Sequence, residues 1–93
     1  KILHLAAVFA CNFSNHLYTI AASILADHRL SFDLLKPLIA ETADKIRLND
    51  PAKMQTGPAI RKDVKTMNAH LKLLSKDKKL KTIYKLMSDH IME

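Results

Sequence analysis

The sequence predicts an all-α protein, in which a long central N-terminal helix is packed by three to four shorter helices. The chain has one Gly and three Pro among its 93 residues, too few for strands joined by tight turns. Residues 2–26 contain neither, and they are rich in Ala and Leu, which favour helices. Later segments repeat apolar residues at helical spacing. A length of 93 residues suits one domain, so residues 1–93 are predicted to form a single helical domain.

The first helix is expected to run from Ile2 to about His28, and it is apolar on nearly every side. One narrow polar line follows helical spacing along it. The line consists of His4, Asn12, Asn15, Thr19 and Ser23, with His16 beside it. An Asn in such surroundings needs a hydrogen-bond partner. We expect Asn12 to bond a neighbouring helix or a facing subunit, or the polar line to border a ligand cleft.

The next segments carry helix-start signals. Ser31 is a suitable N-cap for a second helix that reaches about Leu48. Pro37 lies inside that pattern, so a kink is expected one turn in, unless the helix begins later. Asp50 followed by Pro51 predicts a short helical turn over residues 51–54.

Residues 55–63 are predicted to form a connector, because Gly57 can adopt a positive φ angle there. Asp63 is a good N-cap for the third main helix. The buried face of that helix should contain Val64, Met67, Leu71 and Leu74. The chain restarts at residues 75–77 and continues into a last helix. Its inward face should contain Leu80, Ile83, Tyr84, Met87 and Ile91, with lysines around the rest.

The connector also offers a candidate anion site. Thr56, Gly57 and Pro58, together with Arg61, can present backbone donors and a guanidinium to a carboxylate or phosphate. The alternative is an ordinary connection between helices.

The net charge of +6 is unevenly distributed. Residues 50–93 carry ten Lys or Arg against five Asp or Glu, whereas residues 1–49 carry five against four. A basic half can contact nucleic acid or an anionic cofactor, but lysines on helix faces also keep a small protein in solution. The lysines of the last helix occupy several faces, so we expect no specific binding of nucleic acid.

Cys11 is the only cysteine, so an internal disulfide is impossible and a reducing cytoplasm is expected. Among Ala and Phe, its thiol should be buried and unreactive. The five histidines lack the spacing of a zinc motif, so no metal site is expected. Asn12, Asn15 and His16 interrupt the apolar segment, which argues against a membrane span. The chain begins at Lys1 and is expected to be part of a longer protein.

Two stretches together resemble a known family. They are residues 4–10 (His-Leu-Ala-Ala-Val-Phe-Ala) followed by Asn12-Phe13, and residues 56–63 (Thr-Gly-Pro-Ala-Ile-Arg-Lys-Asp) followed by His70-Leu71. Both are similar to the C-terminal helical domain, a domain of unknown function, of a bacterial family of Rossmann-like NADP oxidoreductases. Residues 32–39 and 41–42 share the likeness, which covers the whole chain. The family is distantly similar to pyrroline-5-carboxylate reductase and to the 6-phosphogluconate and β-hydroxyacid dehydrogenases.

The resemblance implies a fold like the C-terminal domain of 6-phosphogluconate dehydrogenase. Such a domain forms a homodimer through its first helix and closes a substrate cleft against the nicotinamide. The residues implied to face that cleft are His4, Asn12, Thr56, Gly57 and Arg61. NADP or NAD is expected in an N-terminal Rossmann-like domain, so this chain alone would bind no cofactor and would be inactive. The small-molecule substrate is not identified.

The sequence departs from the family pattern at two positions, with Cys11 where Ser is usual and Lys62 where Gly is usual. It also has no Lys between Ile2 and His28 to match the catalytic Lys of the β-hydroxyacid dehydrogenases. The first hypothesis is therefore a domain of an NAD(P)-dependent oxidoreductase. The alternatives are a small basic domain that binds nucleic acid and a scaffolding domain.

Overall fold

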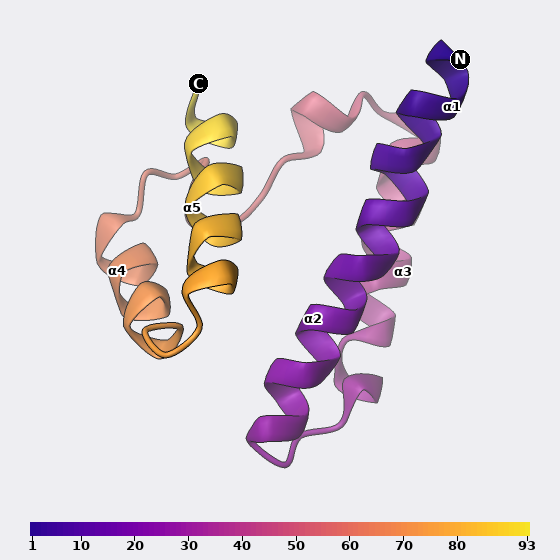
Figure 1. Ribbon diagram of the computed structural model, residues 1–93. Helices are drawn as coiled ribbons and strands as arrows, with labels where there is room; N and C mark the ends of the chain where they lie inside the picture. Colours follow the sequence, from indigo (N-terminus) through magenta and orange to yellow (C-terminus); the bar gives the residue numbers. More distant parts are fainter. The chain divides into compact units, whose positions relative to one another are not determined.

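A computed structural model describes residues 1–93, and its regular elements are all helices (Figure 1). The predicted all-α class is confirmed. The chain divides into an N-terminal unit, Lys1–Arg47, and a C-terminal unit, Leu48–Glu93.

The N-terminal unit opens with one continuous helical stretch. Helix α1 (Ile2–Ala7) leads into a π-helical segment, η1 (Val8–Phe13), which leads into α2 (Ser14–Asp27). The predicted long first helix is confirmed, but the π segment was not foreseen. A π-helix bonds residue i to i+5, so its turn is wider than an α-helical turn and the rotation per residue is smaller. The predicted polar line therefore does not continue straight from His4 to Asn15, because η1 changes the rotation between them.

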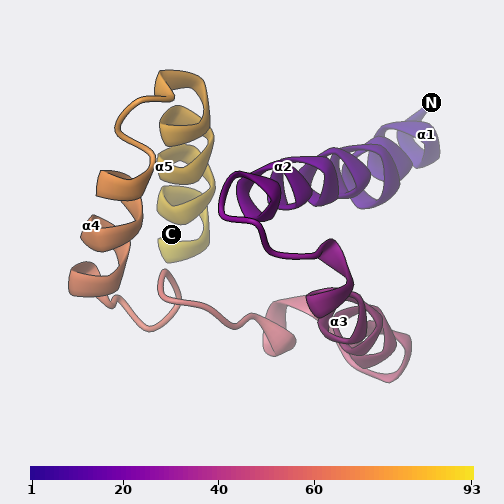
Figure 2. The same ribbon diagram turned by 90° about the horizontal axis from the view of Figure 1, so that it is seen from below.

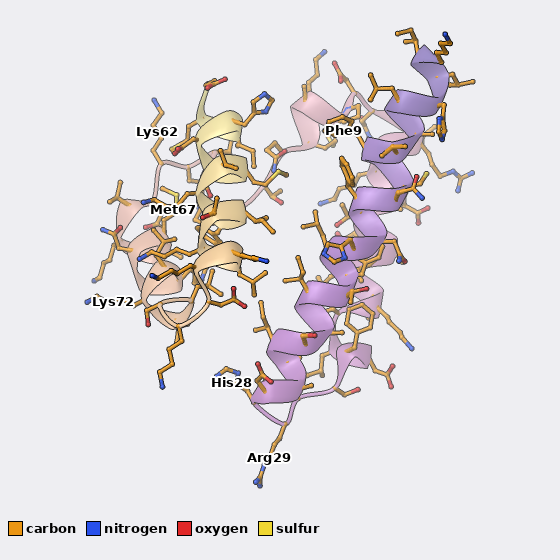
Figure 3. The ribbon with its side chains drawn as sticks, viewed as in Figure 1. Phe9, His28, Arg29, Lys62, Met67 and Lys72 are labelled. Carbon is orange, nitrogen blue, oxygen red and sulfur yellow. The ribbon has the colours of Figure 1, made fainter.

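Helix α2 ends in a Schellman turn. The Leu30 N–H donates to the Leu25 carbonyl at 2.9 Å, and the Arg29 N–H donates to the Ala26 carbonyl at 3.1 Å. This pattern requires a left-handed residue at the position of Arg29, whose φ is +57°. The Arg29 side chain extends away from the turn (Figure 3). The predicted break at residues 28–30 is confirmed.

The second predicted helix starts later than expected. Ser31 does act as a cap, since its Oγ accepts the Asp33 N–H at 3.1 Å. However, it caps a short 3₁₀ turn, η2 (Phe32–Leu34), and helix α3 (Lys36–Leu48) begins after it. Pro37 thus lies in the first turn of α3, where its missing N–H has no intrahelical partner to lose. The alternative expectation, that the helix begins later, is therefore confirmed, and Pro37 does not interrupt a continuous helix.

Helix α3 runs antiparallel to α2 (Figure 1). An open, mainly apolar groove of about 180 Å³ lies between them, lined by Tyr18 and Ala21 on one side and by Leu35, Leu38, Ile39 and Thr42 on the other. No residue of this unit is buried. The surface of this unit has three exposed ion pairs: Asp33–Lys36, Glu41–Lys45 and Asp44–Arg47.

The C-terminal unit is a helical hairpin preceded by a structured connector. Asp50 caps the 3₁₀ turn η3 (Pro51–Met54) through its Oδ1, which accepts the Ala52 N–H at 3.2 Å, as predicted. Helices α4 (Val64–Leu73) and α5 (Lys78–Met92) lie side by side in both views (Figures 1 and 2). Asp77 caps α5 by accepting the Leu80 N–H at 3.0 Å.

The core of the C-terminal unit is small. Its buried side chains are Ala59, 5% exposed, and Met67, 8% exposed, the latter on α4 (Figure 3). The predicted stripe on α4 is correct for Met67 and wrong for Val64, which is exposed at the first turn of the helix. Other members of the two predicted stripes are half-buried, namely Leu71, Leu74, Leu80, Tyr84 and Ile91. Ile83 and Met87 were predicted inward, and both are exposed.

Candidate functional site

Two candidate residues, His4 and Asn12, lie on the first helical stretch. Both are exposed, His4 on α1 and Asn12 within the π segment η1. Asn12 makes no hydrogen bond to a neighbouring helix of the same chain. The expectation that it bonds such a helix is therefore wrong. A bond across a subunit interface stays a prediction. Further along the polar line, the Thr19 hydroxyl donates to the Asn15 carbonyl at 3.3 Å, within its own helix.

Cys11 was predicted to be buried, and it is exposed. The prediction was wrong because it inferred burial from the apolar neighbours of Cys11 in the sequence. Those neighbours, including Phe9 and Phe13, are themselves exposed. The structure contains no group of three or more His, Cys, Asp or Glu side chains that could hold a metal ion. None of its helices is long and apolar enough to cross a membrane.

The other three candidates, Thr56, Gly57 and Arg61, lie within six residues of the connector. Gly57 has a φ of +100°, as predicted. A Cβ built at this position would touch nothing within 4 Å, so the backbone angle alone favours glycine there. Thr56 is exposed, and its carbonyl accepts a hydrogen bond from the Gln55 side chain at 3.0 Å.

The connector ends in a second Schellman turn, which places Arg61 just before α4. The Asp63 N–H donates to the Pro58 carbonyl at 2.9 Å, and the Lys62 N–H donates to the Ala59 carbonyl at 3.0 Å. Lys62 is the left-handed residue of this turn, with a φ of +54°. This angle gives a physical reason for the glycine that the resemblance implies at this position. The Lys62 side chain points away from the loop (Figure 3).

Asp63 joins the connector to α4. Its Oδ1 accepts the Thr66 N–H at 3.1 Å, and its Oδ2 accepts the Thr66 hydroxyl at 2.7 Å, which confirms the predicted N-cap. These two bonds from Thr66, with a smaller contribution from Arg61, lower the pKa of Asp63 below its ordinary value of 3.8. The Arg61 Nη2 lies 4.0 Å from the Asp63 Oδ2, and most of the Arg61 side chain is exposed. The guanidinium is therefore only loosely held and can contact an anion.

A polar contact between α4 and α5 was not foreseen. The His70 Nδ1 and the Tyr84 hydroxyl are 2.7 Å apart, and the two rings meet edge to face at 5.7 Å. Burial raises the pKa of the Tyr84 hydroxyl. Which of the two groups donates the hydrogen bond follows from the tautomer of the His70 ring. The two residues are 14 positions apart, and only the hairpin brings them together. The sequence signal was the position of Tyr84 on the predicted inward face of the last helix; nothing in the sequence pointed to His70 as its partner.

The candidates thus form two sets, one in each unit. His4 and Asn12 belong to the N-terminal unit, and Thr56, Gly57 and Arg61 belong to the C-terminal unit. The first set consists of two exposed polar side chains. The second consists of the exposed Thr56, the turn at Gly57, and Arg61 with its long ion pair to Asp63. No candidate is part of a catalytic constellation within its own unit.

The fold and these residues define an all-helical domain that has an exposed apolar first helix and no nucleotide-binding sheet. A comparison with protein families identifies the domain more closely. The family described as a domain of unknown function, DUF2520, matches residues 1–91, and the chain therefore belongs to this family.

A solved structure gives a second comparison. The crystal structure described as that of a "putative NADP oxidoreductase" from Bacteroides fragilis is 48% identical in sequence, with a TM-score of 0.97. The match covers 99% of this chain and 36% of that one, so this chain spans about a third of the length of its neighbour. No curated protein matches the chain. The resemblance inferred from the sequence is confirmed.

Proposed function

We propose that this chain is the dimerisation and substrate-cleft domain of an NAD(P)-dependent oxidoreductase, and that it is inactive by itself. One observation carries the proposal. Nearly the whole chain matches about a third of a protein described as an NADP oxidoreductase, at 48% identity and with a TM-score of 0.97. The rest of that protein leaves room for a cofactor-binding domain. We propose the cytoplasm as the location, and a homodimer through the first helix.

The chain's own residues do not fit a dinucleotide site. Such a site needs a strand, a glycine-rich turn that lets the backbone approach the pyrophosphate, and a helix that starts at this turn. This chain has no strand, and its single glycine, Gly57, is followed by Pro58. We therefore place NADP or NAD in a separate N-terminal Rossmann-like domain, and we assign no cofactor contact to this chain.

For the substrate side of the cleft, we propose the five candidate residues with different roles. Arg61 would bind an anionic group of the substrate. Its guanidinium is exposed, and its one ion pair, with a single oxygen of Asp63, is long at 4.0 Å. Thr56 would offer an exposed hydroxyl, and Gly57 would hold the turn that presents it. His4 and Asn12 would supply donors and acceptors from the first helix, where both are exposed.

The first test is to measure NADPH binding, by quenching of NADPH fluorescence, with the full protein and with this chain alone. The full protein should bind NADPH and the chain should not. Failure of the full protein to bind either nicotinamide cofactor would contradict the proposal, as would tight binding of one DNA sequence in preference to others.

The second test concerns Arg61. With the full protein, NADPH oxidation is screened with small carboxylate-bearing carbonyl or imine compounds. Arg61→Ala should raise KM for the active compound by about ten-fold or more and leave the NADPH Kd unchanged, because one charge-assisted bond contributes about 1.5–3 kcal/mol. Arg47→Ala is the matched control, since Arg47 is also exposed and loosely paired with one carboxylate. An unchanged KM for Arg61→Ala would remove this residue from the cleft.

A further inference from the structure

His70 is a half-buried histidine on α4 whose two ring nitrogens have different surroundings. Its Nδ1 is 2.7 Å from the Tyr84 hydroxyl of α5. Its Nε2 has no hydrogen bond within the chain, and no buried side-chain nitrogen or oxygen of the structure lacks a hydrogen-bond partner. The Nε2 of this ring is therefore accessible to solvent. One nitrogen holds the imidazole in place, and the other is open to a ligand.

The other four histidines are not held in this way. All of them are exposed, namely His4, His16, His28 and His90. Among them only His28 makes a ring hydrogen bond, from its Nδ1 to the Ile24 carbonyl of its own helix at 3.1 Å. A side chain whose rotamer is fixed before a ligand arrives loses less conformational entropy on binding. His70 is thus the histidine of this chain that is best prepared to bind a ligand.

His70 lies on the same face of α4 as the N-cap that follows the connector. Asp63, Thr66 and His70 are spaced at i, i+3 and i+7, so their side chains share one face of the helix. The Asp63 Oδ2 accepts the Thr66 hydroxyl at 2.7 Å and lies 4.0 Å from the Arg61 Nη2. Thr66 contributes most to the lowered pKa of Asp63, and the nearby charges of Arg61 and His70 lower this pKa further. Arg61 and His70 therefore both lie near the same carboxylate.

We propose that His70 belongs to the substrate cleft, where its Nε2 binds the carbonyl or imine group of the substrate and Arg61 binds the carboxylate. The inference rests on the proposed function, and it adds a residue and a narrower substrate class. When the ring proton is on Nε2, Nδ1 accepts the Tyr84 hydroxyl and Nε2 is a donor for a carbonyl oxygen. Tyr84 is then a positioning residue, which acts through His70.

The helix sets the spacing of the two groups that the substrate needs. Thr66, which is bonded to Asp63, is one turn away from His70, and Cβ atoms at this spacing are about 5–6 Å apart. The carboxylate that meets Arg61 and the carbonyl that meets His70 should therefore be separated by several bonds. A 2-oxo dicarboxylic acid such as 2-oxoglutarate has this spacing, because methylene groups separate its distal carboxylate from its carbonyl. Pyruvate is too short.

The first test follows the histidine rings of the full protein by NMR, with carbon-13 at Cε1. This carbon lies between the two ring nitrogens, so its signal responds to a new hydrogen bond at either of them. The His70 signal is the one that His70→Gln removes. 2-Oxoglutarate should shift it, whereas glutarate, which has the same two carboxylates without the carbonyl, should not. A His70 signal that 2-oxoglutarate does not shift, or that both compounds shift equally, would overturn the inference.

The second test separates a ligand contact from a structural role. The side-chain amide of Asn can take the place of Nδ1, and that of Gln can take the place of Nε2. His70→Asn should therefore weaken 2-oxoglutarate binding by about five- to ten-fold, which corresponds to one lost hydrogen bond, and His70→Gln should keep most of the affinity. His90→Asn is the matched control, since His90 is an exposed histidine of the same unit, and it should leave the affinity unchanged. Equal losses in His70→Asn and His70→Gln would overturn the ligand contact.

Tyr84→Phe tests the positioning role. It removes the hydroxyl that holds the imidazole, so it should weaken 2-oxoglutarate binding several-fold while the compound still shifts the His70 signal. An unchanged affinity would remove Tyr84 from the site. Far-ultraviolet circular dichroism checks that each variant keeps its helices. NADPH binding by the same samples reports separately on the proposed function: a full protein that binds NADPH but whose His70 signal does not respond would contradict this inference alone.

Discussion

The two units of the chain are held together in different ways. The N-terminal unit has no buried residue, and its helices α2 and α3 flank an open groove. The C-terminal unit buries Ala59 and Met67, and it joins its two helices by the His70–Tyr84 bond. Burial of apolar surface is the main favourable term in folding. The C-terminal unit therefore carries a small core of its own, whereas the N-terminal unit has none.

Ion pairs are distributed in the opposite way, with more of them in the unit that has no buried residue. Three of the five cations of the N-terminal unit make ion pairs, and in the C-terminal unit only Arg61 does so. All of these pairs are exposed, and exposed pairs contribute little to stability. The unit with more ion pairs is thus the unit with less internal support. Stability within each unit should respond to changes in packing and capping much more than to changes in surface charge.

The largest effect should come from the core of the C-terminal unit. Met67→Ala removes the side chain of its largest buried residue and should lower the free energy of unfolding by about 2–5 kcal/mol. Urea unfolding of the full protein, followed by circular dichroism, measures the change. Leu73→Ala on the same helix is the control, because Leu73 is 78% exposed, and it should change stability by less than about 0.5 kcal/mol. Equal losses in the two variants would contradict the core assigned to the C-terminal unit.

The N-cap of α4 should give the next largest effect. Asp63→Ala removes the acceptor of two hydrogen bonds from Thr66 and should lower the melting temperature by about 5 °C near neutral pH. Asp63→Asn is the control, since Asn also caps helices well. Ser31→Ala offers the comparison in the N-terminal unit, and its effect should be smaller because Ser31 caps only a single 3₁₀ turn.

The cap should also depend on pH in a defined direction. The pKa of Asp63 is lowered in the folded state, so its charged form stabilises the fold above the ordinary value of 3.8. That stabilisation is lost as the pH falls through the lowered pKa. The difference in melting temperature between the wild type and Asp63→Ala should be constant from pH 7 to about pH 5 and shrink below about pH 4. A difference that grows in acid would reverse the assigned direction.

The His70–Tyr84 bond should contribute less than the core. Tyr84→Phe removes the hydroxyl and keeps the ring, so the loss should be about 1 kcal/mol in the urea unfolding experiment. His70→Ala combined with Tyr84→Phe completes a double-mutant cycle, which isolates the coupling between the two side chains. Additive losses, with no coupling, would show that the bond does not help to hold the hairpin together.

Local features were predicted well because local chemistry determines them. The caps at Ser31, Asp50 and Asp63 and the positive φ of Gly57 follow from residue types within a few positions of each other. The exposure of Cys11 was predicted wrongly, because burial depends on what covers a helix and the neighbouring sequence does not reveal that. The His70–Tyr84 contact needs the hairpin to form first. The π segment has no local signal that the periodicity of apolar residues could reveal.

For the candidate site, the sequence supplied the residues and the resemblance supplied their roles. The structure gives a reason for the glycine that the resemblance implies at position 62, because Lys62 occupies a left-handed backbone position there. The roles of His4, Asn12 and Arg61 stay predictions, since a substrate cleft is defined by the surfaces and the cofactor that meet there.

The smallest expected effect compares the two units directly, since each contains one Schellman turn with a non-glycine residue at positive φ. Arg29→Gly and Lys62→Gly relieve a left-handed conformation that disfavours residues with a Cβ by about 1–2 kcal/mol. Glycine also makes the unfolded chain more flexible, which offsets about 0.5–1 kcal/mol of that gain. Each variant should therefore be more stable than the wild type by about 0.5 kcal/mol. Ala69→Gly, at an exposed position in the middle of α4, is the control of opposite sign and should be less stable by about 1 kcal/mol. If Lys62→Gly raised the urea midpoint of the full protein and Arg29→Gly did not, the positive φ of Arg29 would not be a strain that lowers the stability of the N-terminal unit.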